Sequence, residues 1–204
     1  MKKKEFEAIG KRLLHELPGF VVKGELLVIR PIGKILRGVC FNRSINPRSF
    51  YVEIFVQPLF VPSQYIVLNF GKRLGGSCHS WNADAPNLIT EISTALKCEA
   101  LPFLSCVESL LDFVEVAKSF STGNPHTPRA IAFALARAGR NSEAVEVLDQ
   151  LMNQINLEVP WQREMADMAK SLKTQLLSDP IAAQKQLDAW EAETIRNLGL
   201  EDFR

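Results

Sequence analysis

The chain has 204 residues, of which 47% are hydrophobic and 23% are charged, with a formal net charge of +1. This balance is typical of a folded globular protein and excludes a disordered or a collagen-like chain. No apolar run approaches the roughly 20 residues that a membrane helix needs, and the basic start leads into an amphipathic pattern instead of the apolar core of a secretory signal. We therefore expect a cytoplasmic protein that does not bind a membrane.

The small net charge conceals an uneven distribution. Residues 1–80 contain 13 Lys and Arg against 5 Asp and Glu, a net of +8, whereas residues 81–204 contain 11 against 18, a net of −7. A basic half is typical of proteins that bind nucleic acid, phosphate groups or an acidic protein. The alternative is that the two halves neutralise each other within the fold, because charge counts describe association and not fold.

Helical and alternating periodicities follow one another in the first 120 residues. Residues 4–17 have an apolar stripe at helical spacing, which Pro18 and Gly19 end. Residues 20–22, 25–30, 34–42, 50–57 and 65–70 are then predicted as strands. Their connections are too short for crossover helices, so we expect an antiparallel meander. Two predicted helices follow, with apolar stripes that begin at Leu88 and at Leu104, and they end near Phe120.

The remainder of the chain has helical periodicity. Residues 121–128 form the densest cluster of turn residues and predict a linker. Helices are expected at residues 129–138, 142–156, 160–177 and 180–198. The predicted fold is α+β: a domain over residues 1–120 with an N-terminal helix, a five-stranded antiparallel meander and two closing helices, then the linker 121–128 and an all-helical extension over residues 129–204.

A segment of the extension resembles a known repeat unit. Residues 132–148 read AFALARAGRNSEAVEVL, with small residues on the first helix, Gly139 at the turn and Ala144 opening the second helix. Residues 129–156 thereby resemble a single tetratricopeptide-type helical hairpin. Stacked repeats need about three such units, so we interpret the segment as an ordinary helical hairpin.

Cysteine and histidine are the candidates for nucleophilic or metal chemistry. The four cysteines form no Cys-x-x-Cys pair and lack the spacing of zinc ligands, so we expect free thiols and neither a metal nor a cofactor. Cys98 and Cys106 lie in an apolar helical stretch, where cysteine usually acts as a small hydrophobic residue. Cys78 and His79 follow a glycine-rich loop and are the candidate nucleophile and base, although adjacent side chains rarely point at each other.

Basic and aromatic residues of the predicted sheet and of the loop after it are the candidates for binding. Arg37 and Arg43 share strand parity and are expected on one face, and Tyr51 is expected on the outer face of the neighbouring strand. Such residues bind single-stranded nucleic acid or an acidic protein surface. Trp81, beside a predicted helix start, is either an interface anchor or a core residue. The predicted binding residues are Arg37, Arg43, Tyr51, Lys72, Arg73, His79 and Trp81.

The first 120 residues also resemble a bacterial α+β domain family. Its pattern is a short N-terminal helix and a Gly-Phe turn into a Lys-Gly hairpin whose second strand ends in arginine; residues 19–30 here read GFVVKGELLVIR. Members of this family are suspected to be immunity or accessory proteins near toxin genes. The resemblance implies a binding module without a known catalytic centre.

Three functions therefore remain open. The leading hypothesis is a non-catalytic cytoplasmic protein-binding module of the immunity or accessory kind, whose partner is an acidic protein. The second is a nucleic-acid-binding module that uses the basic half of the chain. The third is an enzyme that uses Cys78 and His79.

Overall fold

The computed structural model describes residues 1–120 and 123–204 and divides into two compact units. Unit 1 comprises Met1–Gln57, Phe70–Val107 and Asp202–Arg204, and unit 2 comprises Pro58–Asn69 and Glu108–Glu201. This division differs from the predicted one at 121–128, since the helix over residues 110–118 falls in unit 2 and a helix already begins at His126. Residues 121 and 122 of the predicted linker lie outside the described residues.

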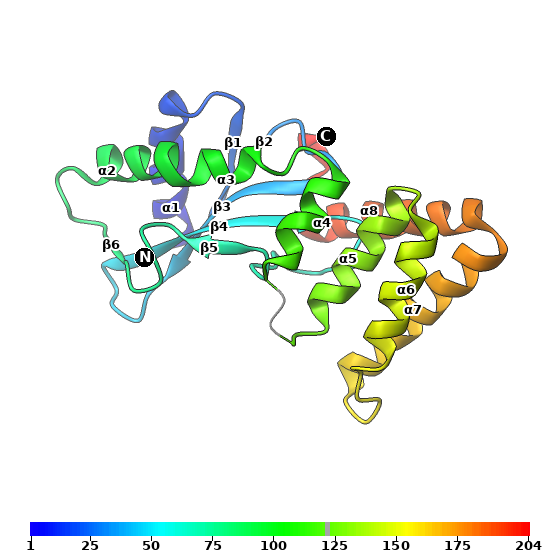
Figure 1. Cartoon of the computed structure of the whole chain (residues 1–204). Helices are drawn as coiled ribbons and strands as arrows, with labels where there is room; N and C mark the ends of the chain where they lie inside the picture. The colour runs from blue at the N-terminus through cyan, green and yellow to red at the C-terminus, as the bar shows by residue number, and fades with distance from the viewer. Residues whose placement is uncertain (121–122) are drawn as a thin grey trace. The chain divides into compact units, whose positions relative to one another are not determined.

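Unit 1 is built on a sheet with the strand order β1-β2-β3-β4-β5, and β6 also pairs with β4 (Figure 1). The strands are β1 (Phe20–Lys23), β2 (Leu26–Ile29), β3 (Ile35–Arg43), β4 (Ser49–Pro58), β5 (Gly71–Arg73) and β6 (Trp81–Asn82). The predicted α+β class with an antiparallel sheet is confirmed. The first four predicted strands agree with β1 to β4 to within one residue at each end.

The fifth predicted strand, at residues 65–70, is wrong. The segment before it bonds to helix α8 (Pro180–Leu198) of unit 2: Ser63 donates its amide to Thr194 Oγ1 at 3.3 Å, and Asn197 Nδ2 donates to Ser63 O at 3.3 Å. The sheet resumes only at Gly71, where a Cβ would lie 1.9 Å from Ile54 O. Glycine therefore permits the close approach of β5 to β4, and the apolar run before it does not mark the strand.

An aromatic cluster joins the N-terminal helix to one face of the sheet of unit 1. The ring of Phe6, on α1 (Lys3–Leu13), stacks on Phe41 of β3 at 5.9 Å and meets Phe50 of β4 edge-on at 5.6 Å. All three rings are at most 2% exposed, so each contributes most of the hydrophobic free energy available to its side chain. The predicted helix from Leu88 is present as α2 (Leu88–Ala95), a π-helical turn (Leu96–Ala100) and α3 (Leu101–Ser105).

Unit 2 is helical, and each of its helices packs against the next. They are α4 (Leu110–Lys118), α5 (His126–Arg137), α6 (Asn141–Met152), α7 (Pro160–Ser178) and α8. The last four agree with the four helices predicted for the extension, whereas the helix predicted from Leu104 begins only at Leu110, because Leu104 belongs to α3 and the chain is not helical at Val107. Gly139 has a φ of +77° and ends α5 in a turn where Arg140 N donates to Leu135 O at 2.9 Å. The helical hairpin predicted for residues 129–156 is thus α5 and α6.

An arginine on α5 holds α8 against it within unit 2. The Arg137 side chain is 8% exposed, and its Nη1 donates to Gln184 Oε1 at 3.2 Å. Its Nη2 donates to Glu191 Oε2 at 3.2 Å and also to Asp188. A buried guanidinium is tolerated only when such partners compensate its lost hydration, so this contact fixes the register of the two helices.

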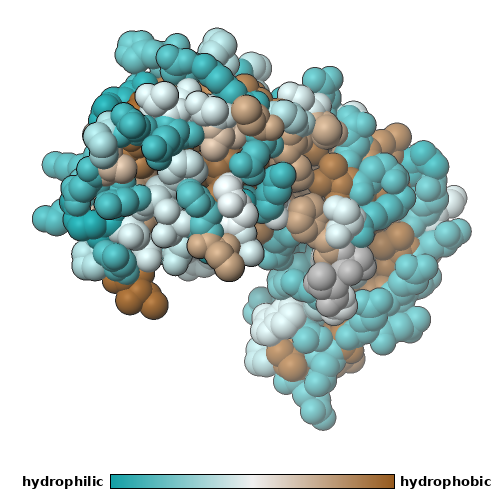
Figure 2. Space-filling view, turned by 60° about the vertical axis from the view of Figure 1, so that its left-hand side comes forward, coloured by the Kyte–Doolittle hydropathy of each residue, from teal (hydrophilic) through white to brown (hydrophobic). Residues whose placement is uncertain are grey.

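Figure 2 shows a face that is hydrophilic over most of its area, with hydrophobic residues scattered over it. The cysteines are free, and Cys98 and Cys106 are exposed, so the expectation that they act as small hydrophobic residues is wrong. Their positions fall on the outer side of the helical segment whose inner side carries Ile92 and Leu96. Within residues 1–120 and 123–204, no helix is both long and apolar enough to span a bilayer.

Candidate functional site

The structure brings Tyr51, Glu53 and Arg73 together on one face of the sheet of unit 1. Phe50 faces α1, so the alternation of β4 turns Tyr51 and Glu53 to the opposite face. The register of β4 and β5 places Arg73 directly opposite Glu53. We call these three residues, with Lys72 and Ser77, the Arg73 cluster.

Arg73 is fixed by three contacts within this cluster. Its guanidinium carbon lies 3.8 Å from the centroid of the Tyr51 ring, which is a cation–π geometry. Its Nε donates to Glu53 Oε1 at 3.1 Å, and its Nη1 donates to Ser77 O at 2.7 Å. The side chains of Arg73 and Glu53 are 28% and 16% exposed. The cation is therefore held in one orientation and still reaches solvent.

A pocket of about 430 Å³ opens beside Arg73, lined by Glu53, Lys72, Arg73, Gly76, Ser77 and Glu99. Both of its carboxylates are already engaged, since Glu53 pairs with Arg73 and Glu99 Oε2 accepts the Gly75 amide at 3.3 Å. Lys72 is exposed and has no ion pair among the described residues. Lys72 is thus the charge at this pocket that is available to a partner.

The loop that contributes Gly76 and Ser77 to the pocket lining ends at a buried tryptophan. Trp81 is 6% exposed and pairs with Phe50 in the register of β4 and β6. The ring of His79 meets it edge-on, with 4.5 Å between the centroids, and His79 itself is exposed. Trp81 Nε1 is buried without a hydrogen-bond partner. Of the two roles expected for Trp81, its burial favours the core residue.

The candidate nucleophile and base do not meet in a catalytic geometry. Cys78 Sγ lies 3.9 Å from Ser77 Oγ, while the His79 ring packs on Trp81. No hydrogen bond joins Cys78 to His79 in the described part of the chain. Burial, and then the charges of Glu25 and Glu53, raise the pKa of the Cys40 thiol to about 12, so that this cysteine stays protonated.

Arg37 and Arg43 share the parity of Phe41 on β3 and thus the sheet face that α1 covers, away from Tyr51. Arg37 Nη1 donates to Leu104 O at 3.2 Å, which joins β3 to α3. Arg43 lies at the strand end and pairs with Glu25 at 3.7 Å. The structure therefore separates these two arginines from the Arg73 cluster, and it gives Arg37 a packing contact.

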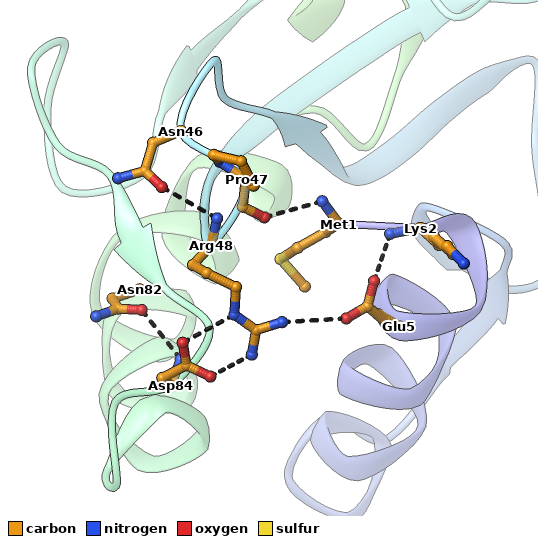
Figure 3. A network of polar contacts seen from close by, with 8 residues as sticks. All are labelled: Met1, Lys2, Glu5, Asn46, Pro47, Arg48, Asn82 and Asp84. Carbon is orange, nitrogen blue, oxygen red and sulfur yellow. Dashed lines mark hydrogen bonds and ion pairs between the residues drawn. The ribbon is translucent and has the colours of Figure 1, made fainter.

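A further arginine, Arg48, ties three segments of unit 1 together (Figure 3). Its Nε donates to Asp84 Oδ2 at 2.8 Å, its Nη2 pairs with the same carboxylate, and its Nη1 lies 3.4 Å from Glu5 Oε1. The hydrogen bond from Arg48 lowers the pKa of Asp84. Met1 N donates to Pro47 O at 3.0 Å beside this network. Arg48 thus connects α1, the β3–β4 turn and the segment after β6.

The charge asymmetry of the sequence persists in the compact units. Unit 1 contains 15 Lys and Arg against 9 Asp and Glu, a net of +6, and unit 2 contains 9 against 14, a net of −5. No group of His, Cys, Asp and Glu with the arrangement of a metal site occurs in residues 1–120 and 123–204. Comparisons with family models, curated proteins and solved structures found no match.

Proposed function

We propose that the protein is a non-catalytic protein-binding module of the cytoplasm, which recognises an acidic protein through the Arg73 cluster of unit 1. The observation that carries the proposal is the pairing of an immobilised cation, Arg73 on Tyr51, with the exposed and unpaired Lys72 beside it. Arginine and tyrosine are enriched at protein interfaces, where a side chain that is already ordered loses little entropy on binding.

The electrostatics of unit 1 support the same partner. A net charge of +6 attracts an acidic surface over the Debye length, which is about 8 Å at physiological ionic strength. Lys72 then steers the encounter, and Arg73 offers its guanidinium to a carboxylate at short range. The immunity or accessory role is supported by the resemblance of residues 19–30 to that family.

Nucleic acid is the competing ligand for a basic surface. Two observations favour a protein partner: Arg37 and Arg43 lie away from Tyr51, and the guanidinium of Arg73 already covers one side of the Tyr51 ring, on which a base would have to stack. The contacts of Cys78 and His79 likewise favour binding over catalysis, since neither side chain is hydrogen-bonded to the other.

The test is affinity capture from the source cells with tagged wild-type protein, Lys72→Glu and the matched control Lys4→Glu, which reverses an exposed charge on α1 of the same unit. We expect one acidic protein to be retained by the wild type and by Lys4→Glu, to be lost by Lys72→Glu, and to survive nuclease treatment. Equal retention by both variants would refute the site. Loss of the captured material on nuclease treatment would establish the nucleic-acid function instead.

A further inference from the structure

Unit 2 contains an arginine without an acidic partner, although the unit is rich in carboxylates. It has 14 Asp and Glu against 9 Lys and Arg, yet no carboxylate pairs with Arg129 among the described residues. Arg137, eight residues further along α5, has the partners that usually compensate a buried guanidinium, namely two carboxylates and one amide. The isolation of Arg129 is therefore a local feature and does not follow from the composition of the unit.

The surroundings of Arg129 leave part of its guanidinium unsatisfied. Its Nη2 lies 3.3 Å from His126 Nδ1, and its Nε, like that of Arg137, is buried without any hydrogen-bond partner, but Arg129 lacks the carboxylates that surround Arg137. Because an arginine can only donate, His126 accepts through Nδ1 in this contact and carries its proton on Nε2. Burial lowers the pKa of Arg129 to about 10, as expected for a cation that no anion compensates.

An aromatic side chain of α7 completes the cluster. The Trp161 ring stacks on His126 with an interplanar angle of 8° and a centroid distance of 5.1 Å, and Trp161 is 45% exposed. His126 also begins α5, whose N-terminus carries positive partial charge. The amide of His126 is already bonded to Asn124 Oδ1 at 3.0 Å, so the side chains and not that amide are available to a ligand.

We propose that Arg129, His126 and Trp161 form an oxyanion-binding site, which takes a carboxylate or a phosphate group. The planar set of N–H donors of a guanidinium matches the geometry of a carboxylate and of a phosphate group. An oxyanion that accepts these hydrogen bonds replaces the water that burial removes from Arg129. Trp161 gives the site a hydrophobic wall that is open to solvent. This site lies in unit 2 and is independent of the Arg73 cluster in unit 1.

The test is NMR titration of the full chain labelled with ¹⁵N, in which the indole N–H signals of Trp81, Trp161 and Trp190 are three internal probes. Sodium phosphate and sodium acetate are added separately against chloride at constant ionic strength, because exposed charges respond to salt alone. We expect a saturable shift of the Trp161 signal with at least one of the two anions, while Trp190, which stacks on Phe133, does not move. The anion with the tighter binding identifies the group recognised.

Three variants complete the experiment. Arg129→Gln should weaken binding at least about tenfold, the effect of losing a hydrogen bond to a charged group, and Arg129→Lys should weaken it less because it keeps the charge. Arg140→Gln is the matched control, since Arg140 is exposed and already paired with Glu143. The proposal is overturned if Trp161 gives no saturable shift in the wild type, or if both Arg129 variants bind as the wild type does.

Discussion

Truncation of Trp81 measures directly whether this residue belongs to the core or to a binding surface. A tryptophan buries about 150–250 Å² on folding, and at about 25 cal/mol per Å² its side chain contributes about 4–6 kcal/mol. Trp81 is 6% exposed, so nearly all of this applies, less the part that an alanine methyl retains. We expect Trp81→Ala to destabilise unit 1 by about 3–5 kcal/mol.

The indole nitrogen of Trp81, which has no hydrogen-bond partner, allows a second prediction for a phenylalanine variant. A buried N–H without an acceptor costs about 1–3 kcal/mol, and Trp81 Nε1 is such a group. Trp81→Phe removes the N–H and keeps most of the apolar area. The two effects oppose each other, so we expect Trp81→Phe to change the stability by no more than about 1 kcal/mol, far less than the alanine variant.

The assay must separate the two compact units, since they need not unfold together. Native-state hydrogen exchange at amides of β3 and β4 reports the free energy of opening unit 1 alone. Trp161→Ala, at a half-exposed tryptophan of unit 2, is the control and should leave these amides unchanged. A loss below about 1 kcal/mol in Trp81→Ala would refute the assignment of Trp81 to the core.

The close approach at Gly71, the exposure of the cysteines and the Arg48–Asp84 ion pair can each be tested separately. Gly71→Ala should destabilise the sheet by about 2 kcal/mol or more in chemical unfolding, because its Cβ would meet Ile54 O, whereas Gly33→Ala, with open space around it, should stay within about 0.5 kcal/mol. A thiol reagent should label the three exposed cysteines quickly and the half-buried, protonated Cys40 slowly; four equal rates would contradict this. Asp84→Asn should lower the thermal unfolding midpoint at neutral pH but not in strong acid. The pKa of Asp84 is lower in the folded than in the unfolded protein, so the Asp84 carboxylate stabilises the fold above its usual pKa. This stabilisation is lost as the pH falls through the pKa of Asp84 in the folded protein. A pH-independent difference would count against the Arg48 pair.

Long periodic segments made most of the fold predictable. Helices α5 to α8 and strands β3 and β4, of nine and ten residues, extend over enough residues for their apolar periods to be recognised. Strands β5 and β6 have three and two residues, too few to show any alternation, and so the sheet was expected to end earlier. The apolar residues 65–68 belong instead to a segment of unit 2 whose Ser63 bonds to α8, a tertiary contact that the local sequence does not indicate.

The candidate site was only partly predictable. Parity correctly put Arg37 and Arg43 on one face of β3, but it gave no indication that α1 covers that face or that Tyr51 lies on the opposite one. The partnership of Glu53 with Arg73 depends on the register of β4 and β5, which the local sequence does not indicate. The isolation of Arg129 has no sequence signal, because it depends on which carboxylates fail to reach it.

The pairing of the acidic residues determines where the excess positive charge of residues 1–80 is left uncompensated. Each of the five carboxylates in residues 1–80 is paired with a cation: Glu5 with Arg48, Glu7 with Lys11, Glu16 with Lys97, Glu25 with Arg43, and Glu53 with Arg73. Paired charges attract a distant partner weakly, because their fields cancel beyond a few ångströms. The excess charge therefore acts through cations such as Lys72 that no carboxylate neutralises. Arg73→Glu would place two carboxylates together at Glu53 and disturb the sheet itself, so reversing Lys72 alone is the change that probes recognition without disturbing the fold.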